Sequence, residues 1–279
     1  MSAAIQLKRQ GYSPILFEED NLGGVLKEAN LVENYPGFPG GVSGHELAGL
    51  FTKQYESHSI NTIYEKVIEL DFNDGQFIAH TDNHSANANY AIIASGTKPK
   101  IPNEMKPFID TNDRILVSVY PLLNIKDKTI VIVGSGDIAF DYALNLHGAN
   151  DVTMLNRGEG IKCLELLQDR VDQSERIKYF KNTQIVNVIT TDEKQLQINC
   201  NTVATIIADY ILCAVGRKAN IGFLSDNLID RKTELEKDSR LYFIGDCKGT
   251  IFRQTAIAAG DAIETAMKID IKMKAEKSR

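Results

Sequence analysis

The chain has 279 residues, which is typical of about two domains at roughly 150 residues each. Its 31 basic and 37 acidic side chains give a net charge of −6, which argues against a protein that binds nucleic acid or adheres to membranes through a basic face. Hydrophobic residues make up 43% of the chain and charged residues 24%, so the composition predicts a folded globular protein.

Neither the cysteines nor the histidines form a recognisable site. The cysteines are Cys163, Cys200, Cys213 and Cys247, with no Cys-x-x-Cys pair, which favours reduced thiols over disulfides or a zinc site. The histidines have no partner at metal-ligand spacing, so we expect no metal. No apolar run reaches the ~18 residues of a membrane span, and the N-terminus does not resemble a signal peptide. We therefore expect a cytoplasmic protein with no membrane or nucleic-acid partner.

The first part of the chain predicts a helix, a buried parallel strand and a glycine- and proline-rich loop. The expected elements are a helix at 2–10, a strand at 15–17, a loop over 23–41, a helix at 44–57 and strands at 67–72, 77–80 and 90–94. A long irregular loop inside a compact domain is usually functional. We expect the last three strands to form an antiparallel meander, with Asn73-Asp74-Gly75 as its first turn.

The same pattern then repeats. The expected elements are a strand at 129–133, a helix to about 146, a strand at 151–155, a helix at 163–172, strands near 184–190, 195–199 and 203–214, a strand at 241–246 and a helix at 253–269. This order predicts an α/β fold with two Rossmann-like three-layer nucleotide-binding domains, each carrying a β-meander, the second inserted into the first. We expect the domains to be 1–111 with 219–279, and 112–218.

The strongest local motif is the glycine turn after the strand at 129–133. There Gly134-x-Gly136-x-x-Ala139 stands between a β-branched strand and a helix. The first glycine permits the tight turn, the second lets the backbone approach a pyrophosphate, and the small third residue packs the helix on the strand. The alternative is a tight turn that binds nothing.

Coenzyme choice depends on the end of the next strand. An NAD site would place a carboxylate about 20 residues after the first glycine, but the sequence there is Met154-Leu155-Asn156-Arg157. Arg157 with Lys162 could meet the 2′-phosphate of NADPH, which favours NADPH over NADH, or Arg157 could be a solvated loop charge. Glu18 and Asp246 are acids at the ends of the strands at 15–17 and 241–246, where sheets of this class bind ligands, although Glu18 could equally be a surface acid.

Further motifs extend over nearly the whole chain. They are Gly23-Gly24-Val25-Leu26, Val32-Glu33-Asn34-Tyr35-Pro36-Gly37, Ala94-Ser95-Gly96, Gly134-x-Gly136-x-x-Ala139, Gly216-Arg217, Gly245-Asp246 and Arg253-Gln254. In this order they resemble the low-molecular-weight thioredoxin reductase family of FAD- and NAD(P)H-dependent flavoproteins. The resemblance implies that Gly24 and Asn34 lie against the flavin, that Asp246 contacts the ribityl–pyrophosphate region, and that Gln254 begins the helix under the isoalloxazine. The same motifs complete the expected cofactor-binding set with Gly23, Ala94, Gly96, Gly245 and Thr255.

The chain departs from the family pattern in two places. Met1 stands where the family's first Gly-x-Gly-x-x-Gly turn ends, so we expect this chain to hold FAD weakly. The family's redox Cys-x-x-Cys position, counted back from Gly134, is taken by Val117-Ser118-Val119-Tyr120. Thioredoxin reduction by the usual dithiol route is therefore not expected. Tyr120 could instead cover the flavin face, or simply pack in the interdomain hinge.

We thus expect an enzyme that takes hydride from NAD(P)H, passes it to FAD, and delivers the electrons to an unidentified acceptor without a dithiol. One alternative is a ferredoxin- or flavodoxin-NADP reductase, although the chain ends without the aromatic residue usual in those enzymes. The other alternative is a non-catalytic nucleotide-binding remnant. The resemblance also implies a homodimer.

Overall fold

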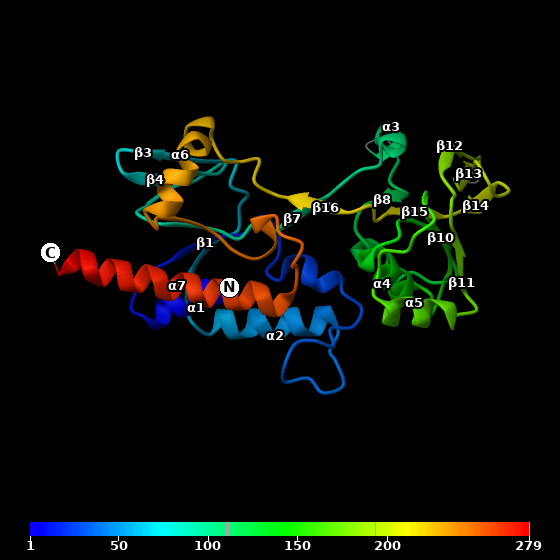
Figure 1. Cartoon of the computed structure of the whole chain (residues 1–279). Coiled ribbons are helices and arrows are strands. Elements are labelled where there is room, and N and C mark those ends of the chain that lie inside the picture. The colour runs from blue at the N-terminus through cyan, green and yellow to red at the C-terminus, as the bar shows by residue number, and fades with distance from the viewer. Residues whose placement is uncertain (110–111, 193, 279) are drawn as a thin grey trace. The chain divides into compact units, whose positions relative to one another are not determined.

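The computed structural model describes residues 1–109, 112–192 and 194–278 (Figure 1). Its contacts gather in two compact units, of which the first comprises Met1–Leu26, Glu33–Lys98 and Lys218–Arg279, and the second Lys27–Val32 and Pro99–Arg217. The second unit thus includes Lys27–Val32 and Pro99–Ile109, which the sequence-based division assigned to the first domain. The functional assignment of each domain stays a prediction. Among the described residues, no helix combines the length and the apolar character needed to cross a membrane.

The second unit is built on a parallel sheet of five strands. The order across the sheet is β11 (Ile177–Phe180), β10 (Asp151–Leu155), β9 (Thr129–Val133), β15 (Tyr210–Cys213) and β8 (Ile115–Leu116). Helices α4 (Asp137–Leu146) and α5 (Glu165–Asp172) follow β9 and β10, respectively. The antiparallel meander consists of β12 (Ile185–Thr190), β13 (Leu196–Cys200) and β14 (Ile206–Ala208).

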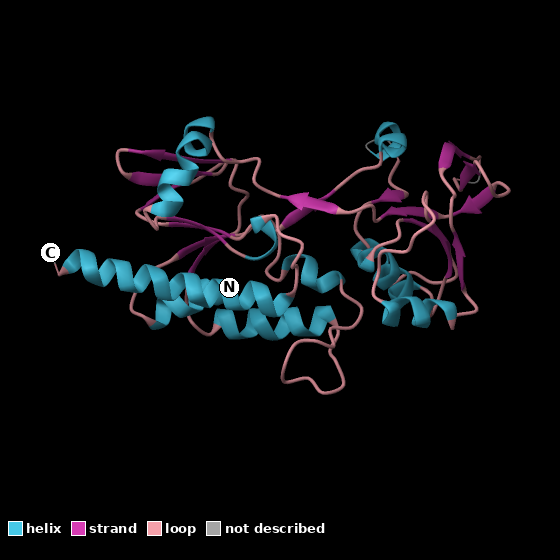
Figure 2. Cartoon of the chain, viewed as in Figure 1, coloured by secondary structure: helices cyan, strands magenta, loops and turns pink. Residues whose placement is uncertain are grey.

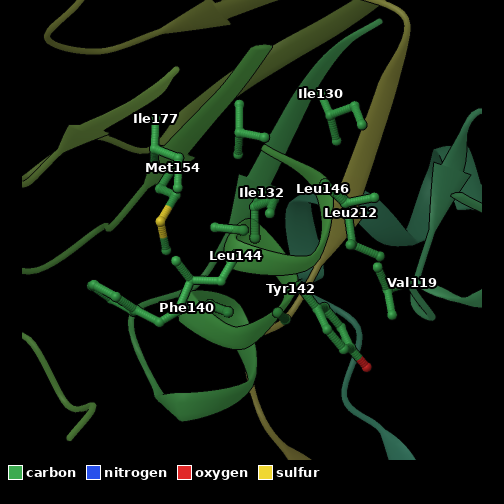
Figure 3. Packing of buried hydrophobic residues seen from close by; sticks show 14 of the residues in the cluster. Val119, Ile130, Ile132, Phe140, Tyr142, Leu144, Leu146, Met154, Ile177 and Leu212 are labelled. Carbon is green, nitrogen blue, oxygen red and sulfur yellow. The ribbon is translucent and has the colours of Figure 1, made fainter. Parts of the chain in front are cut away.

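Alternate side chains of β9 build two cores and so create three layers. Ile130 and Ile132 are completely buried in one cluster with Phe140 of α4 and Met154 of β10, and Figure 3 shows these side chains converging. Val131 points to the other face, where it packs with the meander. Successive side chains of a strand alternate between faces, so a strand that is apolar throughout must be covered on both sides.

The first unit contains two parallel strand pairs and a meander (Figure 2). The pairs are β1 (Ile15–Phe17) with β2 (Asn61–Ile63), and β6 (Ala91–Ile93) with β17 (Leu241–Phe243). The meander is β3 (Glu69–Asn73), β4 (Gln76–His80) and β5 (Ser85–Ala88). The helices are α1 (Ser2–Arg9), α2 (Gly44–Glu56), α6 (Asp226–Lys237) and α7 (Thr255–Lys277), with the short 3-10 helix η4 (Gly245–Lys248). The 3-10 helix η1 (Gly24–Glu28) begins in the first unit, and its last two residues belong to the second.

Two strand predictions need correction, and in both units the error concerns the third strand of the meander. The expected strand at 90–94 is not the third strand of the meander: β5 takes that place, and β6 pairs in parallel with β17. The expected strand at 203–214 is in fact two strands, β14 in the meander and β15 in the parallel sheet. The change occurs at Asp209, whose carboxylate accepts a hydrogen bond from the backbone N–H of Thr129 at 2.9 Å.

Short connecting elements complete the chain. Strands β7 (Thr97–Pro99) and β16 (Arg217–Ala219) pair with each other, and the chain passes between the two units within them. The 3-10 helices η2 (Asn103–Met105) and η3 (Tyr120–Leu122) and the one-turn helix α3 (Lys106–Ile109) lie in the second unit.

Candidate nucleotide-binding sites

The glycine turn of the second unit has the geometry that its sequence predicts. Gly134 has a φ of +153°, and a Cβ added there would lie 2.4 Å from the backbone oxygen of Ala214, so only glycine fits. A Cβ on Gly136 would meet no atom within 4 Å, which leaves its backbone open to a ligand. Ala139 is completely buried one turn into α4. The turn therefore offers a free helix N-terminus of the kind that binds phosphate.

The loop after β10 is tied to this turn. The N–H of Lys162 donates to the carbonyl oxygen of Ser135 at 2.8 Å, and the N–H of Leu164 donates to Oδ1 of Asp137 at 2.8 Å. Gly136 and Lys162 also form an isolated parallel bridge. The structure thus brings Lys162 beside the glycine turn, as expected for two parts of one coenzyme site.

Arg157 and Lys162 are both exposed in this loop. Among the described residues, neither side chain has a hydrogen-bond or ion-pair partner. Asn156, which precedes Arg157, is only 4% exposed, and its side chain forms hydrogen bonds within the loop. The two free cations are thus available to an anionic ligand, whereas Asn156 is not.

In the first unit, the turn after β17 lies close to the first turn of α7. Gly245 has a φ of +62°, and a Cβ added there would lie 3.1 Å from the Cβ of Ala258. The N–H of Gly245 donates to Oδ2 of Asp261 at 3.1 Å, and Nζ of Lys248 lies 3.1 Å from the same carboxylate. Asp246 is half-buried beside this contact. The close approach and the left-handed φ favour glycine at 245, and they place the strand end beside the N-terminal part of a 23-residue helix.

Two motifs that are 220 residues apart meet in this unit. Nδ2 of Asn34 donates to Oε1 of Gln254 at 2.9 Å, immediately before Thr255 begins α7. Ser95, between Ala94 and Gly96, donates its hydroxyl to the carbonyl oxygen of Asn220 at 2.6 Å. The pairing of Asn34 with Gln254 fits the resemblance, in which both residues lie against the same ring.

The remaining predicted residues of the first unit lie along the loop after β1. Glu18 directly follows that strand and accepts a hydrogen bond from the N–H of Asp20 at 3.1 Å. Burial raises the pKa of the Glu18 carboxyl. Gly23 and Gly24 have φ values of +106° and +50°, so this loop turns through the left-handed region that favours glycine.

The segment just after Gly24 is anchored in the second unit. The carboxylate of Glu28 accepts hydrogen bonds from the hydroxyl groups of Ser118, at 2.6 Å, and Tyr142. The N–H of Asn30 donates to Oδ2 of Asp141 at 3.0 Å. Ser118 is the second residue of Val117-Ser118-Val119-Tyr120, the segment at the expected Cys-x-x-Cys position, so this segment is bonded to Glu28. Tyr120 ends the segment and is 53% exposed.

The cysteines are all free thiols. Cys213 and Cys247 are buried, and Cys163 and Cys200 are half-buried. The thiol of Cys247 donates to the carbonyl oxygens of Ile93 at 3.0 Å and Ile244 at 3.1 Å, and burial raises its pKa. Burial in this way makes a thiol less reactive, because the thiolate is the nucleophile.

Sequence reasoning did not identify Asn156, Asp261 or Glu28 as residues whose side chains hold the loops of the candidate sites by hydrogen bonds. Asn156 was noted only as the absence of a carboxylate. Asp261 carried a signal, since it is the first acid in the alanine-rich first half of α7. Glu28 carried none, because its partners lie 90 and 114 residues further along the chain.

Comparison with known proteins agrees with this geometry. The sequence profile of the family described as pyridine nucleotide-disulphide oxidoreductase matches residues 1–263. The thioredoxin reductase of Chlamydia trachomatis is 27% identical to this chain over 290 residues, covering 95% of this chain and 92% of the relative.

Solved structures show the same fold. The thioredoxin reductase of Lactococcus lactis, in its FR conformation, superposes with a TM-score of 0.82 at 21% identity over 97% of this chain and 95% of that chain. The thioredoxin reductase of T. acidophilum gives a TM-score of 0.81 at 23% identity over 98% and 94%. The predicted α/β fold with two Rossmann-like domains is confirmed. The chain belongs to the pyridine nucleotide-disulphide oxidoreductase family and is a thioredoxin reductase-like oxidoreductase.

Proposed function

We propose that this protein is an FAD-dependent oxidoreductase that oxidises NADPH and delivers the electrons to an acceptor without a redox-active dithiol. In the overall reaction, NADPH and one proton give NADP⁺, and the acceptor gains two electrons and the corresponding protons. The observation that carries the proposal is the Gly134 turn, which requires glycine, together with the open backbone at Gly136.

The second unit would bind NADPH. Gly134, Gly136 and Ala139 would hold the pyrophosphate at the N-terminus of α4. Arg157 and Lys162 would bind the 2′-phosphate by charge-assisted hydrogen bonds. The residues fit this group because the cations have no partners among the described residues and lie in a loop bonded to the glycine turn.

The first unit would bind FAD, and when bound the flavin supplies the ring that accepts hydride. Gly23, Gly24 and the Asn34–Gln254 pair would contact the ring, and Asp246 the ribityl–pyrophosphate region. Gly245 fits this role because it lets the strand end approach α7. Glu18, Ala94, Gly96 and Thr255 complete the proposed site, and their part is to hold the nucleotide in one orientation.

Electron delivery without a dithiol is supported by the sequence. The two nearest cysteines, Cys200 and Cys213, are 13 positions apart, and the expected Cys-x-x-Cys position holds Val117-Ser118-Val119-Tyr120, with Val117 and Tyr120 where the cysteines would stand. Cys213 and Cys247 are buried. Formation of a homodimer stays a prediction of the resemblance.

The test is NADPH oxidation by the FAD-loaded protein before and after alkylation with iodoacetamide. Ferricyanide serves as a one-electron acceptor and a benzoquinone as a two-electron acceptor, and the substitutions Cys163→Ser and Cys200→Ser are measured in parallel. We expect oxidation that neither alkylation nor substitution reduces. Loss of activity on alkylation would contradict a thiol-free route.

The same assay separates the alternatives. Rapid reduction of oxidised ferredoxin or flavodoxin, with slow reduction of quinones, would favour the alternative that the protein is a ferredoxin- or flavodoxin-NADP reductase. Binding of NADPH with no oxidation by any acceptor would favour a non-catalytic remnant.

A further inference from the structure

The end of β10 holds a buried amide where a ribose-binding carboxylate would stand in an NAD site. Asn156 is 4% exposed, so its side chain is directed into the protein and not toward a ligand. Its backbone continues the pairing of β10 with β11: the N–H of Asn156 donates to the carbonyl oxygen of Phe180 at 2.9 Å, and its own carbonyl oxygen accepts from Thr183 at 2.8 Å. The position of Asn156 is therefore fixed on both sides.

The Asn156 amide closes the turn that follows. Oδ1 accepts a hydrogen bond from the N–H of Gly158 at 3.0 Å. Nδ2 donates to the carbonyl oxygen of Gly160 at 3.1 Å and to the hydroxyl oxygen of Tyr179 at 2.9 Å. Both donors of the amide and one acceptor lone pair are used, so the side chain is nearly saturated.

This turn holds the backbone of Arg157 between two fixed residues. Asn156 lies before it, and Gly158 after it is held by the Asn156 amide and by the N–H of Asn182, which donates to the Gly158 carbonyl oxygen at 2.9 Å. The Arg157 side chain leaves this rigid turn into solvent. A long cationic side chain loses less entropy on binding a phosphate when its backbone is already ordered.

Aspartate cannot replace Asn156 without loss. A carboxylate has no N–H, so it could not donate to the carbonyl oxygen of Gly160, and two acceptors would face each other in a buried place. We propose that Asn156 is a positioning residue for coenzyme selection: through the closed turn it presents Arg157 to the 2′-phosphate and excludes the acid that would favour NADH. This inference rests on the proposed NADPH site.

The experiment measures discrimination between two probes on the full chain. Adenosine 2′,5′-bisphosphate and adenosine 5′-monophosphate differ only by the 2′-phosphate, and neither needs a bound flavin. Calorimetric titration gives the ratio of their dissociation constants. We expect the wild-type protein to prefer the bisphosphate and Arg157→Ala to reduce the preference about 10- to 100-fold, the range for hydrogen bonds to charged groups. Asn156→Ala, which frees the turn but keeps the cation, should reduce it about 5- to 10-fold.

Asn150 provides a matched control. It is 2% exposed and lies just before β10, at the other end of the same strand. Its Nδ2 donates to the carbonyl oxygens of Ile125 and Leu146, both at 3.0 Å, and its Oδ1 accepts from the N–H of Lys128 at 3.1 Å. Asn150→Ala therefore removes the same number of hydrogen bonds, and we expect a similar loss of melting temperature with an unchanged binding ratio.

The outcomes separate the two claims. Equal binding of both probes by the wild-type protein would overturn the proposed coenzyme and this inference with it. A preference that Arg157→Ala removes but Asn156→Ala leaves intact would overturn the inference alone, as would an equal effect of Asn150→Ala. Should Asn156→Ala fail to fold, Tyr179→Phe removes one hydrogen bond and keeps the ring, and it should reduce the ratio about 2- to 3-fold; no reduction would overturn the inference.

Discussion

Gly134 and Gly136 should respond differently to replacement with alanine. Gly134→Ala should reduce the stability of the fold, whereas Gly136→Ala should reduce the affinity for NADPH. At Gly134, the new Cβ would lie 2.4 Å from the carbonyl oxygen and 2.9 Å from the carbonyl carbon of Ala214, far inside normal contact. Overpacking of this kind costs about 1–3 kcal/mol, and a φ of +153° costs a non-glycine residue about 1–3 kcal/mol more. The reduced entropy of the unfolded chain returns about 0.4–1 kcal/mol.

Gly134→Ala should therefore lower the free energy of unfolding by about 1–6 kcal/mol, a large part of the 5–15 kcal/mol typical of a protein. At Gly136, φ is −99° and no atom lies within 4 Å of the new Cβ, so the change in stability should stay within about 1 kcal/mol. The methyl group would instead occupy the space where a pyrophosphate approaches. We expect NADPH affinity to fall at least about tenfold, or ~1.4 kcal/mol.

Circular dichroism suits the stability measurement, because the chain has no tryptophan for fluorescence. Thermal melts of wild type, Gly134→Ala and Gly136→Ala give the stability order, and calorimetric titration with NADPH gives affinity. A Gly134→Ala protein that melts with the wild type would refute the close approach to Ala214. A Gly136→Ala protein with undiminished NADPH affinity would refute the turn as the pyrophosphate site.

Three further predictions concern other residues. Burial raises the pKa of Asp141 from 3.8 to about 6, so the folded state binds this proton more tightly and stability falls as the pH rises from about 4 through 6. Asp141→Asn should remove that fall and raise the free energy of unfolding at pH 7 by on the order of 2–3 kcal/mol, with little effect below pH 4. Urea titrations of both proteins between pH 4 and pH 7 measure this difference, and the same pH dependence in both would contradict the prediction. Asn34→Ala should weaken FAD binding about 5- to 10-fold through loss of its amide contact, whereas Asn87→Ala, which breaks an exposed Asn–Gln pair in the meander, should not; equilibrium dialysis compares them. Tyr120→Ala should change the flavin absorbance and speed its reoxidation by oxygen if the ring covers the flavin, and no change in either would leave Tyr120 without that role.

The elements that the sequence predicted well are those whose residues are adjacent in the chain and pack mainly on one another. The β9–turn–α4 segment was predicted with its boundaries nearly unchanged, because the apolar strand, the glycines and the helix are adjacent in sequence. Helix α6 was missed, since only Leu228 and Leu235 of its 12 residues are buried and all its other residues except the exposed Ile229 are polar. β5 was missed because its sequence, Ser-Ala-Asn-Ala, has little strand propensity and depends on pairing with β4.

The candidate sites divide in the same way. Gly134 and Gly136 were predicted because both belong to one local motif, in which the first glycine permits the tight turn and the second leaves the backbone open to a ligand. The contact of Asn34 with Gln254 joins positions 220 residues apart, and only the family resemblance indicated it. The role that we propose for Asn156 could not be predicted from the sequence, because one of its partners is Tyr179 on β11, a strand that the sequence did not predict.

The central claim is that electrons pass from NADPH to an acceptor through bound flavin and not through cysteine thiols. The most direct measurement is anaerobic addition of NADPH to FAD-loaded protein whose accessible thiols have been alkylated, followed by addition of a benzoquinone. We predict that the flavin absorbance bleaches on addition of NADPH and returns on addition of the quinone, at the rates of the unmodified protein. Flavin that stays oxidised, or that is reduced but returns only in unalkylated protein, would contradict the claim.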